Sequence, residues 1–244
     1  GRIGGRLLQI RCAQFTTSDT ILTSTKTNPL FMIELPDRIE KAELADKPKV
    51  VFNGIIEEID TEDKAQKAIR ILRNEKVVGF DTETRPSFAR GQGHKIALLQ
   101  LSTDDMAYLF RLNKIGIPDC IADFLATPDI IKVGVSVKDD FASLASRRKF
   151  SPAGFVELQD MCGGMGIEEK GLQKMYGLLF GERISKNQQL SNWEIESLTE
   201  GQRQYAAVDA WACLRIYRYL LELKQSGEYR IISKHAEESN TEKG

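Results

Sequence analysis

KVVGFDTET, residues 76–84, is the stretch of sequence that decides the fold. Its β-branched start predicts a buried strand, and its end carries two acids and two threonines. KIALLQLST (95–103) and MAYLFRL (106–112) follow at the spacing of hairpins. Together the three segments predict a mixed sheet that begins with antiparallel neighbours.

Beyond these strands the pattern changes to alternating strands and helices. It predicts a helix over 115–126, a buried strand in IIKVGVSV (130–137), a helix over 139–150, a strand in FVELQDM (155–161), a helix over 171–181 ending at Gly181, and a long helix over 198–224. Three antiparallel-type strands followed by βα units are the element order of a ribonuclease H-like α/β sheet with helices on both faces. Neither GxGxxG nor GxxxxGKS/T occurs, so a dinucleotide fold and a P-loop are not supported.

Upstream of this region, VVFNG (50–54) predicts a short strand, and residues 61–75 predict an amphipathic helix that Thr61 opens as the N-cap. We expect the following division of the chain: a poorly ordered N-terminal extension over 1–48, one folded domain over 49–225, and a polar C-terminal tail over 226–244. The first methionine is Met32, so residues 1–31 are interpreted as a tag remnant or an upstream reading of the start codon, with a transit peptide as the alternative.

Composition limits the kind of chemistry. The 244 residues are 41% apolar and 28% charged, enough for one α/β domain with its own core. Four scattered cysteines without a CxxC pair argue against a disulfide framework and a thiolate zinc site, and favour a cytoplasmic location. Two histidines leave little material for a Ser-His-Asp triad or a histidine zinc centre. No apolar run approaches the roughly 18 residues of a membrane span, so we expect no membrane association.

Asp81 and Glu83 are two residues apart on the first predicted strand, so their side chains share a face while Thr82 points to the other. Paired carboxylates at the end of a buried strand are costly unless a cation or several hydrogen bonds compensate them. The alternative is a solvated strand end, which is the favoured interpretation of an isolated DxE pattern.

YAAVDAW places Tyr205 and Asp209 four residues apart on the last predicted helix, hence on one face. The alternative makes Tyr205 a core residue and Asp209 a surface charge paired with Arg203 or Arg215. The alanines, valine and tryptophan around Asp209 argue against it, because they form an unusually apolar setting for a solvated acid.

VGVSVKDD ends a buried strand and begins a helix at Asp139 or Asp140. Either aspartate suits an N-cap, and either projects from the carboxyl end of its strand, where open α/β sheets place ligands. Together the motifs supply four carboxylates and a phenol, the inventory for hard cations such as Mg²⁺ or Mn²⁺. Two such ions, roughly 4 Å apart, activate water and steady the leaving oxygen of a phosphodiester, so the expected chemistry is phosphoryl hydrolysis.

On these motifs the chain resembles the DEDD 3′→5′ exonuclease superfamily, in the tyrosine branch (DEDDy) that includes RNase D and the Werner syndrome exonuclease domain. The motifs are VVGFDTET, KVGVSVKDD and LSNWEIESLTEGQRQYAAVDAWACLRIY. The resemblance implies that Asp81, Glu83 and Asp209 bind the metal that activates water, that Asp140 completes the shell of a second metal, and that Tyr205 positions the water. It leaves Asp139 as a helix cap, although a shift of one residue stays open, and it gives Trp193 a structural role.

The segment after Glu83, RPSFARGQGHK, is the candidate substrate contact. Its residues suited to holding phosphates and stacking a base are Arg85, Phe88, Arg90 and Lys95. An equally weighted alternative is a flexible hydrophilic loop. The formal charge of −1 gives no case for a broadly basic surface, so any grip on nucleic acid must be local.

The sequence therefore predicts a metal-dependent 3′→5′ exonuclease with two divalent cations, Mg²⁺ or Mn²⁺, as cofactors and no small organic cofactor. Its expected partner is the 3′ end of a nucleic acid, single-stranded or recessed, and the Werner-like third motif favours DNA over RNA. The alternative is a catalytically inactive nucleic-acid-binding module of the same fold. Protein partners cannot be read from the sequence.

Overall fold

The computed structural model describes residues 32–86, 95–145 and 147–234. Six strands form the central sheet, in the order β2-β5-β4-β3-β6-β7. They are β2 (Ile55–Ile59), β3 (Val77–Thr84), β4 (Ile96–Ser102), β5 (Met106–Phe110), β6 (Ile131–Gly134) and β7 (Phe155–Glu157). β4 pairs antiparallel with β3 and β5, and the other neighbours are parallel. The mixed ribonuclease H-like sheet predicted from the element order is confirmed.

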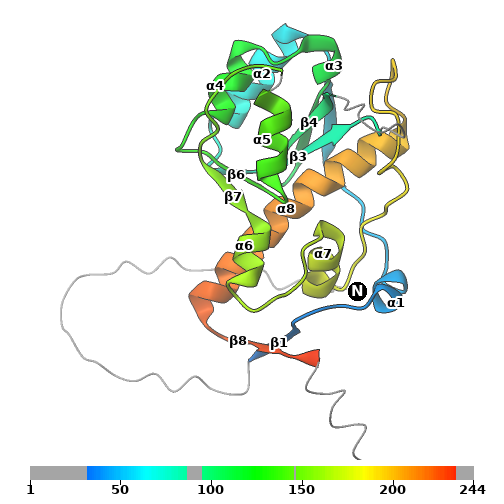
Figure 1. Cartoon of the computed structure of the whole chain (residues 1–244), viewed down its shortest axis with the longest axis vertical. Coiled ribbons are helices and arrows are strands. Elements are labelled where there is room, and N and C mark those ends of the chain that lie inside the picture. Colours follow the sequence, from blue (N-terminus) through cyan, green and yellow to red (C-terminus); the bar gives the residue numbers. More distant parts are fainter. Residues whose placement is uncertain (1–31, 87–94, 146, 235–244) are drawn as a thin grey trace, which may run out of the picture.

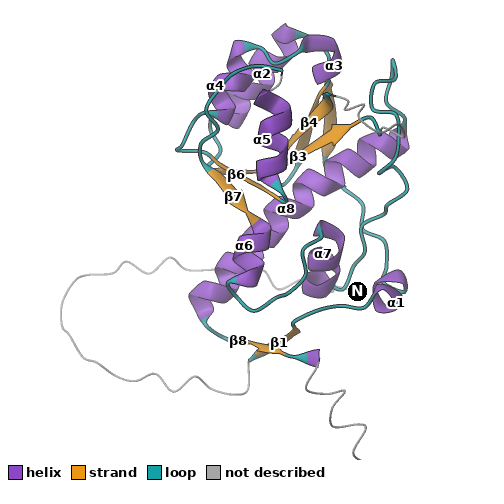
Figure 2. Cartoon of the chain, viewed as in Figure 1, coloured by secondary structure: helices purple, strands orange, loops and turns teal. Residues whose placement is uncertain are grey.

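Helices cover both faces of this sheet (Figures 1 and 2). The helices are α2 (Glu62–Leu72), α3 (Leu112–Ile115), α4 (Asp119–Leu125), α5 (Val137–Ala145), α6 (Leu158–Gly163), α7 (Leu172–Phe180) and α8 (Glu200–Ser226). Apolar residues of α2, α4 and α5 pack against one face, where Val78 and Phe80 of β3 are buried. α8 packs across β3, β4 and β5 on the other face.

α8 lies unusually close to β3 because the contact is made by small residues. A Cβ atom on Gly79 would lie only 1.8 Å from the carbonyl oxygen of Ala210, so this contact requires glycine. The helix starts with a capping box of Thr199 and Gln202, and it ends at Gly227, which adopts a left-handed conformation with φ 65°. The caps and the Gly79 contact fix α8 against the sheet.

The strand predicted in VVFNG (50–54) is wrong, since the strand begins at Ile55. Phe52 is buried because its ring packs edge-on against Trp211, with ring centroids 6.0 Å apart. The Ile55 N–H then bonds the carbonyl of Asp105, which starts the pairing with β5. The apolar residues of the motif serve tertiary packing, which periodicity alone cannot separate from a strand.

Other boundaries also differ from the sequence prediction, and two of the differences have a clear cause in the backbone. The helix predicted over 115–126 begins only at Asp119, as α4, because α3 ends at Ile115, Gly116 has φ 65° and Pro118 precedes α4. β6 ends at Gly134, before the predicted end at Val137, because Ser136 adopts a left-handed φ of 58°. The break turns the chain directly from β6 into α5.

A second, two-stranded sheet lies at the end of the molecule away from the central sheet (Figure 1). Its parallel strands are β1 (Ile33–Pro36) and β8 (Tyr229–Ile232), and α1 (Lys41–Ala45) follows β1. These elements lie in the stretches that the sequence assigns to an extension and a tail, so residues 32–48 contain a strand and a short helix. Residues 1–31 and 235–244 lie outside the described residues, and the division at 49 and 225 stays a prediction. No helix among the described residues is long and apolar enough to cross a bilayer.

Candidate active site

Asp81 and Glu83 of β3 meet Asp209 of α8 where the helix crosses the strand. One carboxylate oxygen from each residue lies within 4.8 Å of the others, which is close enough for all three to bind one ion. Strand alternation puts Asp81 and Glu83 on the face that Gly79 presents to α8, so the close helix contact brings the third acid to them. A purely carboxylate donor set suits Mg²⁺ or Mn²⁺.

The three acids are held in an environment that opposes their ionisation. Burial, with repulsion from Asp209 and Asp140, raises the pKa of Asp81 well above its usual range. Burial and the neighbouring acids raise the pKa of Glu83 to about 10, and burial raises the pKa of Asp209 to about 7. A bound cation would remove this penalty, because it compensates both the burial and the repulsion.

Tyr205 lies one helical turn before Asp209, and the two side chains are hydrogen-bonded. Burial and the nearby acids raise the pKa of Tyr205 above its ordinary value, so its hydroxyl stays protonated and can donate. The ring packs against Trp193, with centroids 5.9 Å apart, and Trp193 is fully buried. The structural role predicted for Trp193 agrees with this packing.

Asp140 lies on α5, outside the group of three. The Thr82 hydroxyl donates to its Oδ1 at 2.5 Å, and Thr82 faces away from Asp81 and Glu83 along the strand. Burial raises the pKa of Asp140 to about 6, and its charge in turn raises the pKa values of Asp81 and Glu83. Asp140 is therefore near Asp81 and Glu83, but its carboxylate oxygens are not part of the cluster that these two acids form with Asp209.

Glu157, at the end of β7, performs the capping role that the sequence prediction gave to Asp139. Its Oε1 accepts from Ser136 N at 3.1 Å and its Oε2 from Val137 N at 2.9 Å, which satisfies the start of α5. Glu157 is also the N-cap of α6, because its Oε1 accepts a hydrogen bond from Gln159 N. The strand predicted over 155–161 therefore ends at Glu157, where α6 begins. A lone glutamate after a short strand carries no sequence signal for this role.

Two of the residues predicted to contact substrate are described, Arg85 and Lys95, and neither lines the cavity at the three acids. Arg85 is exposed and forms an ion pair with Glu194 at 3.4 Å, and Lys95 is exposed. Phe88 and Arg90 lie outside the described residues. Substrate binding by this segment stays a prediction.

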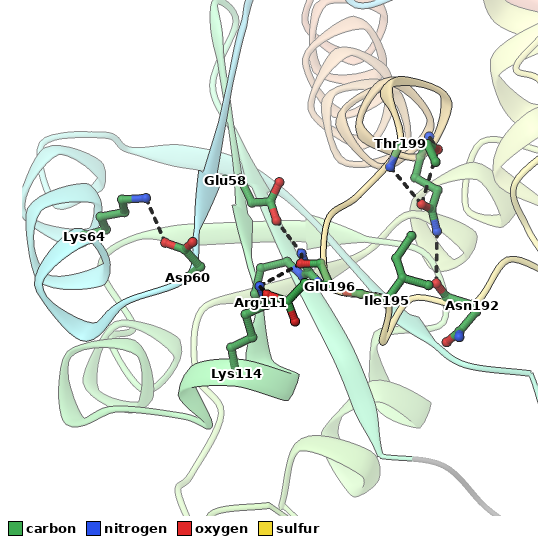
Figure 3. Close-up of polar contacts among 10 residues, drawn as sticks. Glu58, Asp60, Lys64, Arg111, Lys114, Asn192, Ile195, Glu196 and Thr199 are labelled. Atoms are coloured by element: carbon green, nitrogen blue, oxygen red, sulfur yellow. Dashed lines mark hydrogen bonds and ion pairs between the residues drawn. The ribbon is translucent and has the colours of Figure 1, made fainter.

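The loop before α8 is fixed by a buried arginine that sequence reasoning missed (Figure 3). Arg111 is fully buried, forms an ion pair with Glu58 and donates to the Ile195 carbonyl. Lys114 adds a bond to the Glu196 carbonyl at 2.7 Å. Because this loop leads into the capping box at Thr199, the network helps to position the helix that carries Tyr205 and Asp209.

A cavity of about 730 Å³ opens onto the three acids and Tyr205. Four basic residues also line it, Lys41, Lys174, Arg183 and Lys186, and we call them the basic wall. The site thus combines an acidic floor, which suits cations, with a basic wall, which suits anions. A phosphodiester bridged by divalent cations fits both.

Comparison with known proteins agrees with this geometry. The family model described as "3'-5' exonuclease" matches residues 56–224. Mouse "Bifunctional 3'-5' exonuclease/ATP-dependent helicase WRN" is 30% identical over 172 residues, 68% of this chain and 12% of that protein. An Arabidopsis thaliana "3'-5' exonuclease" is 27% identical over 190 residues, 72% of this chain and 64% of that protein. The chain thus spans less than two thirds of either relative.

A solved structure shares the fold. It is Escherichia coli RNase D, described as "an exoribonuclease involved in structured RNA processing". The TM-score is 0.64 at 22% identity, over 70% of this chain and 46% of the RNase D chain. At this identity the likeness establishes the ribonuclease H-like fold alone.

Proposed function

The chain belongs to the 3′-5′ exonuclease family, and from that premise we propose that it hydrolyses phosphodiester bonds at the 3′ end of a nucleic acid with the help of divalent cations. The observation that carries the proposal is the meeting of Asp81, Glu83 and Asp209 within 4.8 Å, beside a protonated tyrosine. Fold alone would not suffice, since one fold hosts many functions.

The three acids would hold one Mg²⁺ or Mn²⁺, and Asp140 with Asp81 would hold a second. When bound, two such ions acidify a water and offset the charge on the leaving oxygen. Asp140 Oδ1 accepts a hydrogen bond from the Thr82 hydroxyl. To bind the second ion, Asp140 would either give up this hydrogen bond or keep it on Oδ1 and bind the ion through its other carboxylate oxygen. Asp81 would be shared by the two ions, since both Asp209 and Asp140 are near enough to raise its pKa.

Tyr205 would act on the attacking water. Its raised pKa keeps the hydroxyl protonated, so the residue orients the water by donating a hydrogen bond and does not serve as a base. Packing against Trp193 restricts the position of the Tyr205 ring. Because the hydroxyl is already in place, less conformational entropy is lost when the water is aligned with the phosphorus atom.

DNA is the proposed substrate on the ground given by the sequence, the resemblance of the motif LSNWEIESLTEGQRQYAAVDAWACLRIY to the third motif of the Werner syndrome exonuclease domain. RNA is the second candidate, because the similarly folded RNase D is described as an exoribonuclease. The decisive experiment incubates 5′-labelled single-stranded DNA, recessed-3′ duplex and RNA with Mg²⁺, Mn²⁺ or EDTA. A metal-dependent ladder that shortens from the 3′ end, absent with Asp81→Asn, is the expected result. Binding without cleavage of any substrate would instead identify an inactive binding module.

The described cysteines, Cys120, Cys162 and Cys213, are all free thiols. Free, partly or fully buried thiols suit a reducing compartment, and this supports our proposal of a cytoplasmic location. Cell fractionation with an antibody to the protein tests it.

A further inference from the structure

The basic wall of the cavity carries positive charges that the proposed chemistry does not use. Lys41 comes from α1, Lys174 from α7, and Arg183 and Lys186 from the chain that follows α7. These residues line the same cavity as the three carboxylates, and no other acid is among its described lining residues. Charge in the cavity is therefore divided between an acidic floor and a basic wall.

Two of these cations have no partner within the described part of the chain. Lys41 and Lys186 are exposed, and neither forms an ion pair or a side-chain hydrogen bond with a described residue. Lys174 is partly neutralised by Glu169 at 3.3 Å. Arg183 is oriented by its Nε, which donates to the Lys47 carbonyl at 2.9 Å. The wall thus offers at least two free charges to an anionic ligand.

Lys41 reaches the cavity on a segment that we call the N-terminal strap, residues 33–50. The strap is tied down near its start, where Ile39 N donates to Glu169 Oε1 at 2.8 Å. Its end is tied to Arg183, whose backbone N–H donates to the Pro48 carbonyl at 2.8 Å and whose carbonyl accepts from Val50 N at 3.0 Å. The strap lies outside the residues matched by the family model, which begin at 56.

α1, the middle of the strap, lies against α7 (Figure 1). A Cβ on Gly177 of α7 would lie 2.2 Å from Leu44 Cδ1, so the absence of a side chain at 177 makes room for Leu44. Glycine inside a helix is less stable than alanine, and here it permits close packing of the strap. This contact and the two ties hold α1 beside the cavity.

We propose that the strap and the chain at Arg183–Lys186 form a phosphate-binding wall, which holds the sugar-phosphate backbone of the strand whose 3′ end enters the acidic site. This inference rests on the proposed function and extends it to substrate grip. A protein of net charge −1 has no general attraction for a polyanion, so its affinity must come from local cations. Backbone phosphates are shared by DNA and RNA, so the wall binds both by the same contacts.

The test compares the wild type with the double variant Lys41→Gln/Lys186→Gln. The control is Lys67→Gln, because Lys67 lies on α2, on the other face of the sheet, and pairs with Asp63. Binding of fluorescent single-stranded DNA and RNA oligonucleotides is measured by anisotropy in EDTA over a series of salt concentrations. EDTA prevents turnover, so binding is read apart from cleavage.

The double variant is expected to bind both oligonucleotides about tenfold more weakly. Its plot of log affinity against log salt should be shallower by about 1.4, because each lost phosphate contact to a single strand removes about 0.7. The control should match the wild type. Unchanged affinity and slope in the double variant would overturn the proposal, and so would a loss confined to DNA or to RNA.

Cleavage assays separate this inference from the proposed function. If the wild type cleaves no substrate but the double variant loses affinity, the wall stands and the exonuclease proposal fails. If the wild type cleaves from the 3′ end and the double variant binds like the wild type, the wall fails and the exonuclease proposal stands.

Discussion

Asp81 on β3 lies directly opposite Gln100 on β4 in the antiparallel register. Opposite residues in such a pair share a face of the sheet, so the Gln100 amide is directed to the side that carries the acids. Gln100 is fully buried, and neither of its amide atoms bonds a described residue. A buried amide without a hydrogen-bond partner is unfavourable. We infer that the Gln100 side chain donates a hydrogen bond to the Asp81 carboxylate when Asp81 is ionised.

Gln100→Leu should have opposite effects on the stability of the fold and on metal binding. Removing the unpaired amide should raise the free energy of unfolding of the metal-free protein by about 1–3 kcal/mol. Loss of the donor beside Asp81 should weaken Mn²⁺ binding by about tenfold or more. Urea unfolding and calorimetric titration measure the two effects. A less stable variant would mean that the amide is already bonded in solution.

The metal-free protein should lose stability as pH rises from about 4 to 7. Burial raises the pKa of Asp209 to about 7, so in this window the folded state holds a proton that the unfolded state releases near its ordinary pKa of about 4. Unfolding is then favoured by increasing pH, by up to about 1.4 kcal/mol per pH unit for this group. Urea unfolding in EDTA between pH 4.5 and 8 measures the slope. Asp209→Asn should make the slope less steep, although Asp81, Glu83 and Asp140, whose pKa values are also raised, keep part of it. An equal slope in that variant would reject the assignment.

Metal binding should reverse this loss and release protons. Because the pKa of Glu83 is raised to about 10, this residue must give up its proton to bind a cation near neutral pH. Mn²⁺ should therefore raise the melting temperature more at pH 8 than at pH 6, and EDTA should abolish the rise. Titrations in two buffers of different ionisation enthalpy count the protons released. A pH-independent affinity with no proton release would contradict the prediction.

Tyr205→Phe should lower kcat by about a hundredfold, as expected when the attacking water is misplaced. Mn²⁺ affinity should change much less, because the phenol is not one of the three clustered ligands. Tyr217→Phe, a buried tyrosine further along α8, is the matched control and should leave kcat unchanged. Initial rates at saturating substrate test both variants, and equal rates for all three proteins would remove Tyr205 from the mechanism.

The part of the site that could be predicted from sequence is the part encoded by local spacing. Asp81 and Glu83 share a strand face, and Tyr205 and Asp209 share a helix face, whatever the rest of the chain does. The order of strands and helices then predicts the sheet, because few topologies accommodate it. The meeting of β3 with α8 follows from that topology and from the glycine at 79.

Contacts between distant segments could not be predicted in this way. Ile33 pairs with Tyr229 in the small sheet, and the strap that follows brings Lys41 to the cavity. The sequence directed attention instead to the basic segment after Glu83, where Arg85 pairs with Glu194. Single residues such as Arg111 carry no periodic pattern, so only the folded chain reveals what they hold.

Arg111 provides the last prediction, because it connects the sheet to the loop before α8. Arg111→Met removes the ion pair with Glu58 and the bond to the Ile195 carbonyl, and leaves both acceptors without their donor. Breaking a buried pair in this way costs about 3–5 kcal/mol, measured by urea unfolding. The double variant Arg111→Met/Glu58→Gln should cost less than the sum of the single variants, because the abandoned charge is also removed. Additive costs would show that the two residues do not interact. If the loop also positions α8, kcat should fall in Arg111→Met even where the variant is fully folded, since Tyr205 and Asp209 lie on that helix.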